Sequence, residues 1–147
     1  MNKEKVKNRL FELQDSIIET LREKIETTHT MVDIDEEDTM DPEDFSHQHE
    51  SGVVKRLITD QLVKELKNLE QLKQIDFNEK QSVMPGAIVK TNSFNFFIGL
   101  ATLPFEVDDE RIIGISAASP IYALLAHKGK GEGFSFRGND YVINSIH

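Results

Sequence analysis

Nine carboxylates between Asp33 and Glu50 are the residues of this sequence whose type and spacing are best suited to chemistry. The stretch contains no Lys or Arg, whereas the whole chain has 26 acidic and 17 basic residues and a net charge of −9. Removing these nine leaves 17 acidic against 17 basic residues, so the entire excess of negative charge lies here. Like charges held close together repel one another, which predicts an exposed segment with a function of its own. The nine are Asp33, Asp35, Glu36, Glu37, Asp38, Asp41, Glu43, Asp44 and Glu50.

Two metal-binding interpretations of this stretch do not fit known ligand patterns. The acidic spacing from residue 33 to residue 44 partly matches a calcium loop of the EF-hand type, but the position that needs Gly is Asp38 and the last ligand is Asp44 instead of a bidentate Glu. His47 and His49 are two residues apart and do not share a helix face, which favours solvated histidines over a transition-metal site. A solvated loop is the remaining structural interpretation.

Two long amphipathic helices are expected on either side of this acidic segment. The run before the segment contains no Pro or Gly, and the run after it contains none beyond Gly52. Both runs repeat apolar residues in steps of three and four. A short connection makes such helices antiparallel neighbours, and about 30 residues give an arm of roughly 45 Å with residues 33–50 at its tip. Pro42 suits a turn or the first turn of the second helix. The first stripe is Val6, Leu10, Leu13, Ile17, Leu21 and Ile25, and the second is Val54, Leu57, Ile58, Leu62, Leu66, Leu69, Leu72 and Ile75.

The C-terminal half has the composition of strands with one short helix. Runs at 87–91, 94–100 and 111–116 are rich in β-branched and aromatic residues. Ser119 and Pro120 are suited to the cap and first position of a helix, and 134–136 with 141–146 form a closing hairpin. The sequence therefore predicts an α+β chain with two domains: residues 1–78 as an antiparallel coiled-coil hairpin, and residues 79–147 as a small antiparallel sheet with one helix.

Composition excludes several classes of function. The chain of 147 residues has no cysteine, so neither a disulfide framework nor a thiolate metal site is possible. No apolar run approaches a signal peptide core or a membrane span, and we expect a soluble cytoplasmic protein. The acidic balance argues against nonspecific nucleic-acid binding. No catalytic triad or nucleotide-binding loop is found, so the chain is not expected to be an enzyme.

Particular residues of the C-terminal third resemble the Gre-type transcript-cleavage factors of bacterial transcription. The Gre family reads there as Ser-Pro-(Ile/Leu), then Ala-Leu-Leu-Gly-Lys, Gly-Asp and Tyr-x-Ile, and the first strand has the pattern Gly-Ala-x-Val. The resemblance implies an N-terminal antiparallel coiled coil and an FKBP-like C-terminal domain. The matching residues here are Gly86, Ala87, Val89, Ser119, Pro120, Ile121, Leu124, Leu125, Lys128, Gly131, Glu132, Tyr141 and Ile143.

This resemblance implies RNA polymerase as the partner. Gre factors pass the coiled coil into the polymerase secondary channel, where acids at its tip help to hold a second Mg²⁺ for hydrolysis of backtracked RNA. Mg²⁺ takes oxygen ligands. By position, the resemblance assigns Asp41, Asp44 and Glu43 as metal ligands. Asp44 stands where the family has Glu. Contact with nascent RNA would be indirect, and a monomer is compatible with this role. The partner-binding residues implied are Ser119, Pro120, Ile121 and Lys128.

Two other functions remain open from the sequence. Some Gre relatives with extra acids at the tip inhibit the polymerase through the same channel, and this chain is rich in such acids. The chain would then be a channel-binding inhibitor or modulator without cleavage activity. From a different class, a coiled coil with an FKBP-like domain is also suited to a protein-interaction scaffold whose acidic tip recognises a basic partner.

Overall fold

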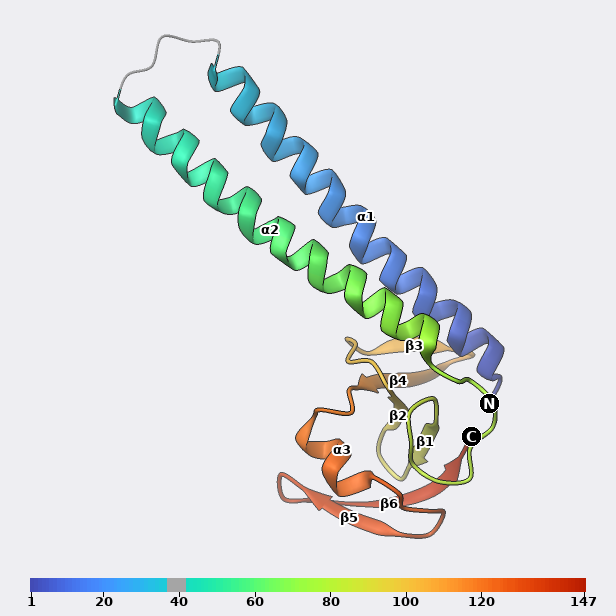
Figure 1. The fold of residues 1–147 in the computed structure, drawn as a ribbon. Coiled ribbons are helices and arrows are strands. Elements are labelled where there is room, and N and C mark those ends of the chain that lie inside the picture. Colours follow the sequence, from blue (N-terminus) through green and yellow to red (C-terminus); the bar gives the residue numbers. More distant parts are fainter. Residues whose placement is uncertain (37–41) are drawn as a thin grey trace. The chain divides into compact units, whose positions relative to one another are not determined.

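A computed structural model gives the fold in Figure 1. It describes the backbone of residues 1–36 and 42–147 and the side chains of residues 1–28 and 52–147. Two long helices come first, then a sheet of six strands with one short helix. The elements are α1 (Lys3–Glu36), α2 (Pro42–Gln74), β1 (Ile88–Thr91), β2 (Asn95–Ile98), β3 (Phe105–Val107), β4 (Glu110–Ile115), α3 (Pro120–Leu125), β5 (Gly133–Phe136) and β6 (Asn139–Ile146).

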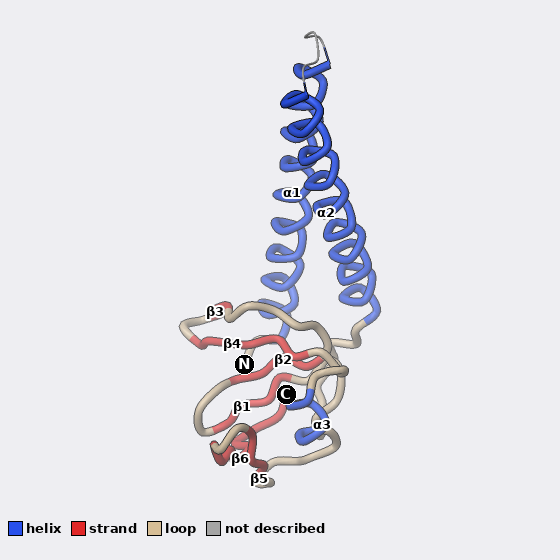
Figure 2. The backbone as a smooth tube through the Cα atoms, turned by 90° about the vertical axis from the view of Figure 1, so that its left-hand side faces the viewer, coloured by secondary structure: helices blue, strands red, loops and turns tan. Residues whose placement is uncertain are grey.

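The predicted α+β class, a helix pair followed by a small sheet, is confirmed. The sheet has the strand order β3-β4-β2-β1-β6-β5, and its strands lie side by side in Figure 2. Its pairs are antiparallel except β2 with β4, which run parallel with Phe96 level with Ile113. The sequence predicted antiparallel pairing throughout and did not predict β3. The β3–β4 hairpin turns through Asp108 and Asp109, whose φ values of 51° and 64° suit a tight two-residue turn.

The contacts divide the chain into two compact units. One consists of Glu12–Glu70, and the other of Met1–Phe11 together with Gln71–His147. The sheet therefore forms one unit with the first turns of α1 and the last turn of α2. The predicted domain boundary between residues 78 and 79 stays a prediction.

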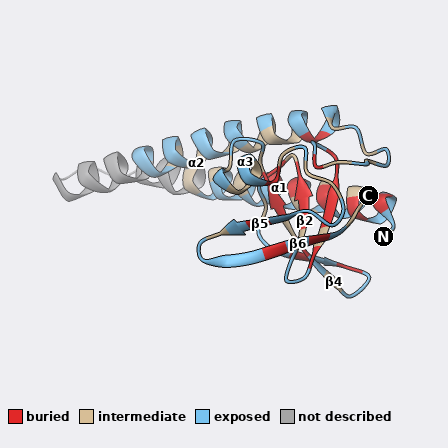
Figure 3. Ribbon diagram, turned by 90° about the horizontal axis from the view of Figure 1, so that it is seen from below, coloured by how far each residue is buried: buried red, intermediate tan, exposed pale blue. Residues whose placement is uncertain are grey.

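The sheet unit has a continuous apolar core on the face that carries α3. Leu125 of α3 is fully buried there against Val89, Ile98 and Ile143 of the central strands. Apolar side chains on the opposite face, including Ile88, Phe97 and Ile112, are also fully buried. Buried residues accordingly concentrate on the strands in Figure 3, whereas most of the described part of α2, residues 52–74, is exposed.

The start of α1 and the segment after α2 are fixed within the sheet unit by side-chain contacts. The Lys3 ammonium donates to the carbonyl of Asn78 at 2.7 Å, and the Lys5 ammonium lies 2.8 Å from an Asp108 carboxylate oxygen. Val6 and Leu72 have no exposed surface. These contacts place the first turns of α1 and the last turn of α2 in one packed unit with the sheet.

Both helices extend further into the acidic segment than the sequence predicted. The acidic tip was expected to span residues 33–50, but α1 continues to Glu36 and α2 begins at Pro42. Pro42 is thus the first residue of α2, one of its two predicted positions, and it suits that place because its missing amide hydrogen has no helical partner there. Only residues 37–41 separate the two helices.

The first predicted apolar stripe is wrong at one position. Ile17 is 44% exposed, whereas its neighbour Ile18 is 5% exposed and faces the other helix. The buried line on α1 therefore runs through Leu10, Gln14 and Ile18, in steps of four. On α2 the predicted stripe is wrong at two positions, because Val54 is 46% exposed and Leu57 is 63% exposed.

Candidate functional site: the helix pair and its acidic segment

The described residues of the unit Glu12–Glu70 form two helical segments that lie antiparallel. Gln14 of α1 contacts Glu65 of α2, and further along α1 Thr20 and Thr27 line a hollow together with Ile58. Later residues of α1 thus lie beside earlier residues of α2, as in an antiparallel pair. At 1.5 Å per residue the α1 part of this unit, residues 12–36, is about 37 Å long. Because the helices are antiparallel, the end of α1 and the start of α2, which carry acids of the segment 33–50, lie at the same end of the pair.

The predicted metal ligands lie at the start of α2 or outside the described residues. Asp41 lies outside them, so the structure gives no position for it. The backbone of Glu43 and Asp44 belongs to the first turn of α2, and their side chains also lie outside what is described. Negative side chains near a helix N-terminus are stabilised by the helix dipole. Elsewhere in the described part of the chain, no group of three or more His, Asp or Glu is arranged to hold a metal ion.

The predicted partner-binding residues lie around α3. The Ser119 hydroxyl accepts from the Tyr122 amide at 3.3 Å and donates to the Ser116 carbonyl at 2.8 Å, so Ser119 is the N-cap of α3. Pro120 is the first residue of α3 and is exposed, while Ile121 is half-buried against the core. The structure thus brings these three together, with two of them occupied in holding the helix in place.

Lys128 lies after α3, at the start of a glycine-rich loop. Its carbonyl accepts from the Val83 amide at 3.0 Å and its amide donates to the Leu125 carbonyl, so the backbone here is fixed while the side chain is half-buried. Within the loop the Gly129 amide donates to a carboxylate oxygen of Glu132 at 2.5 Å. The chain's own carboxylate therefore occupies this backbone amide.

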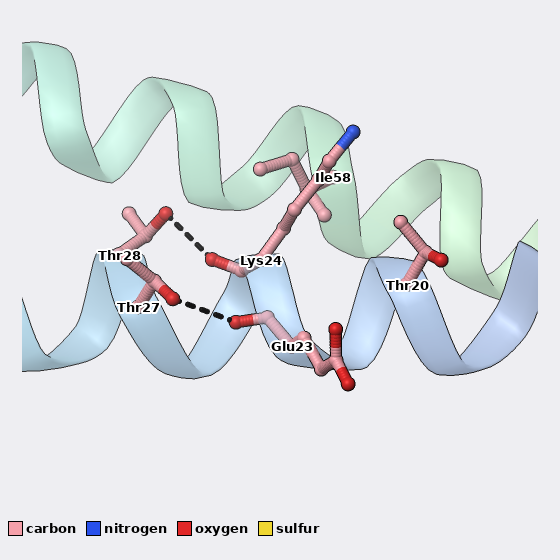
Figure 4. A pocket seen from close by; sticks show the side chains of 6 residues that line it. All are labelled: Thr20, Glu23, Lys24, Thr27, Thr28 and Ile58. Carbon is pink, nitrogen blue, oxygen red and sulfur yellow. Dashed lines mark hydrogen bonds between the residues drawn. The ribbon is translucent and has the colours of Figure 1, made fainter.

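Shallow hollows lie along the seam of the described part of the helix pair. One, of about 380 Å³, is lined by Thr20, Glu23, Lys24, Thr27, Thr28 and Ile58 and is seen in Figure 4. There the hydroxyls of Thr27 and Thr28 donate to the carbonyls of Glu23 and Lys24 in their own helix, so they do not reach across to α2. Another, of about 370 Å³, is lined by Asp15, Ile18, Glu19, Arg22, Leu66 and Leu69.

Sequence reasoning missed one polar contact between the helices. The Gln14 amide nitrogen donates to both the carbonyl and a carboxylate oxygen of Glu65, each at 2.8 Å, and Gln14 is only 5% exposed. Gln14 lies four residues after Leu10 and four before Ile18, so its position in the buried line was visible in the sequence. Its polar side chain gave it the appearance of a surface residue.

The groups with displaced pKa values cluster near the segment that follows α2. Burial lowers the pKa of Lys3 below its usual 10.5, against the opposing effect of Glu79. Hydrogen bonds from Lys80 and from the Asn78 amide lower the pKa of the exposed Asp76 carboxyl. These shifts fit a structural junction, and none involves a predicted site residue.

Comparison with known proteins identifies no family for this chain. No protein-family model matches it, and no curated protein matches it. A solved structure described as the GreA factor homolog 1 (Gfh1) protein of Thermus thermophilus is 17% identical over 93% of this chain and 94% of that chain, with a TM-score of 0.36. A second, described as the transcription factor Gfh1, is 15% identical over 93% and 92%, also with a TM-score of 0.36.

Among the described residues, no helix is both long and apolar enough to cross a membrane.

Proposed function

We propose that this protein binds RNA polymerase as a Gre-like factor and acts in the polymerase secondary channel through its acidic segment. One observation carries the proposal: the whole net negative charge lies in one short stretch, residues 33–50, which includes the end of α1 and the start of α2 in a pair of long helices. Two helices with side chains are together about 20 Å across. Such a pair is suited to presenting carboxylates inside a narrow, deep opening.

The donor set of the acidic segment suits Mg²⁺. Asp41, Glu43 and Asp44 supply carboxylate oxygens, which this small, hard cation prefers over nitrogen or sulfur ligands. A Mg²⁺ ion shared with the polymerase active centre would supply an activated water and stabilise the leaving oxygen in RNA hydrolysis. The task of this chain is to bring two or three oxygens to the ion. The polymerase provides the remaining ligands and the RNA, so the chain is not itself the enzyme.

The surface around α3 would then bind the polymerase. Ser119 caps α3, and Ile121 anchors it to the core. The exposed Pro120 and the side chain of Lys128 are the two residues of the predicted set that are available to a partner. Replacing Pro120 and Lys128 is expected to weaken polymerase binding without unfolding the sheet unit.

Stalled elongation complexes provide the test. The protein is added with Mg²⁺ to complexes whose RNA carries a labelled 5′ end, and the RNA is followed for shortening at the 3′ end or for altered elongation. The matched control is the Asp41→Ala/Asp44→Ala variant, which should still compete for the polymerase but should lose the cleavage effect. If the protein neither binds the polymerase nor changes its RNA products, the proposal is rejected. Recovery of some other protein in place of polymerase subunits would favour the scaffold function.

A channel-binding inhibitor is the second candidate, and the number of acids favours it. Nine carboxylates exceed the two or three that a single Mg²⁺ ion needs from this chain. The excess would suit occupation of the channel and repulsion of incoming nucleotide phosphates. Slower elongation without any shortened RNA is the result expected of an inhibitor.

A further inference from the structure

A buried polar contact joins the two helices across their seam. Gln14 is 5% exposed, and both hydrogens of its amide nitrogen are directed to Glu65, one to the carbonyl and one to a carboxylate oxygen, at 2.8 Å each. Buried amides cost free energy unless they are hydrogen-bonded. Gln14 is therefore satisfied only where it lies level with a suitable acceptor.

The Glu65 carboxylate is itself held in place by neighbours on α2. The Gln61 amide donates to one carboxylate oxygen at 2.7 Å, and the Asn68 amide donates to the other at 3.2 Å. These two bonds lie within α2, whereas the Gln14 bonds join the two helices. The carboxylate is thus a fixed, directional acceptor facing α1.

The apolar part of the seam specifies the alignment of the helices only weakly. Hollows of about 370 and 380 Å³ lie along it, so its side chains do not interlock closely. Apolar contacts are non-directional, and a loosely packed stripe of similar residues tolerates a shift along the axis.

A shift of α1 by one helical turn would break the polar contact. One turn is about 5.4 Å, which would move the Gln14 amide out of reach of the Glu65 carboxylate. The Gln14 amide would then lose its bonds to the carboxylate while still buried. A buried polar group in a helical seam can fix register in this way.

We propose that Gln14 and Glu65 are positioning residues that set the register of α1 against α2, and with it the place of the acidic segment along the axis of the pair. The structural part of this inference is independent of partner binding. Its consequence for activity rests on the proposed function, because the delivery of carboxylates to a metal ion fails if the segment lies one turn too far in either direction.

Register can be measured by spin-label distances, because the chain has no native cysteine. Labels at Arg22→Cys and Lys67→Cys are on exposed positions of the two helices. The unmodified pair should give one narrow distance distribution. Gln14→Leu, which keeps the helix and fills the space with an apolar side chain, should add a second population displaced by about 5 Å along the axis.

Three further variants make the result specific. Gln61→Leu is the matched control, since it removes the same amide from the same carboxylate but within one helix, and it should leave the distance unchanged. Gln14→Lys supplies a new donor to Glu65 and should restore a single population. Glu65→Leu removes the acceptor instead of the donor and should reproduce the second population, which covers the case in which Gln14→Leu does not fold.

Each outcome decides the proposal. An unchanged single distance in both Gln14→Leu and Glu65→Leu overturns it, as does an equal shift in Gln61→Leu or a failure of Gln14→Lys to restore the distance. In the polymerase assay, Gln14→Leu should bind as well as the unmodified protein but lose most of the effect on RNA, and Gln14→Lys should recover it. Absence of any polymerase binding would reject the proposed function while leaving the distance result intact.

Discussion

The ring of Phe77 lies flat on the ring of Phe97, with 5.6 Å between their centroids and 8° between their planes. Phe97 belongs to β2 and is fully buried, whereas Phe77 belongs to the segment that follows α2 and is half-buried. Lys7 belongs to α1, and its ammonium lies 5.8 Å from the centroid of the Phe77 ring. Phe77 is thus held between a strand and a helix of the same packed unit.

Removing this ring should destabilise the sheet unit. Phe77→Ala leaves the face of Phe97 uncovered and creates a cavity, and we expect the free energy of unfolding to fall by about 2–3 kcal/mol, below the full cost for a completely buried ring. Chemical denaturation followed by circular dichroism measures it. Leu103→Ala is the control, because Leu103 is 86% exposed and its loss should change stability by less than about 0.5 kcal/mol. Equal effects of the two substitutions would contradict this role for Phe77.

Two glycines should respond to alanine in opposite directions. Gly86 has φ +93°, and an added Cβ would lie 1.9 Å from the Asp76 carbonyl oxygen, so Gly86→Ala must displace backbone and should cost about 3 kcal/mol or more. Gly52 lies within α2 with no atom within 4 Å of an added Cβ. Gly52→Ala should stabilise the helix by about 0.5–1 kcal/mol. Thermal unfolding of both variants checks the pair, and a loss of stability in Gly52→Ala would show that this part of α2 is not helical in solution.

The helices and most strands were predictable because their periodicity is local. Steps of three and four for α1 and α2, and β-branched runs for β1, β2 and β4, follow from the residues alone. The parallel pairing of β2 with β4 was not predictable, since it depends on how the intervening segment crosses the sheet. β3 was missed because it has only three residues and directly follows Pro104.

The candidate site was predictable in composition but not in geometry. The concentration of charge is visible in the sequence, yet like charges gave no sign that the helices would continue to Glu36 and resume at Pro42. With two adjacent apolar residues, Ile17 and Ile18, periodicity alone did not determine which one faces the partner helix. The buried role of Gln14 was missed because residue type was given more weight than position.

Acidification should destabilise the sheet unit through His147. Burial, and then the charge of the Met1 ammonium, lower the pKa of His147 below its usual 6.5, while Glu79, at 3.9 Å, acts in the opposite direction. The unfolded chain therefore binds more protons than the folded chain just below pH 6.5, and the free energy of unfolding rises with pH there. The stabilising contribution is complete above about pH 6.5 and is lost as pH falls through the folded pKa.

Replacement of His147 by Gln should flatten this pH dependence. Denaturation at several pH values between about 7 and 5 should show a smaller loss of stability in His147→Gln than in the unmodified protein. Asp76→Asn is the control. The pKa of Asp76 is lowered from its usual value of 3.8, so this carboxyl changes the free energy of unfolding mainly in that acidic range. The dependence of stability on pH between 7 and 5 should therefore be the same in Asp76→Asn as in the unmodified protein. An unchanged slope in His147→Gln would show that another group titrates in this range.

Separating the acids into two groups should distinguish cleavage from inhibition. The first group, neutralised to Asn or Gln, is Asp33, Asp35, Glu36, Glu37 and Asp38, and the second is Asp41 with Asp44. If the protein assists cleavage, the second set of substitutions should reduce RNA shortening at least tenfold, because direct metal ligands are lost. The first set should then have a minor effect, since charges farther from the ion are screened by salt within about 8–10 Å.

If the protein inhibits the polymerase, the order of the two effects reverses. Inhibition by repulsion scales with the number of charges, so neutralising five acids should relieve it more than neutralising two. Inhibition by the unmodified protein, and with it the relief that neutralisation gives, should decrease as the salt concentration rises, whereas the effect of losing a metal ligand should not. Elongation and cleavage measured side by side at two salt concentrations give both comparisons. A protein in which neither set changes either reaction does not act through this segment, and the proposed role of the nine carboxylates would have to be abandoned.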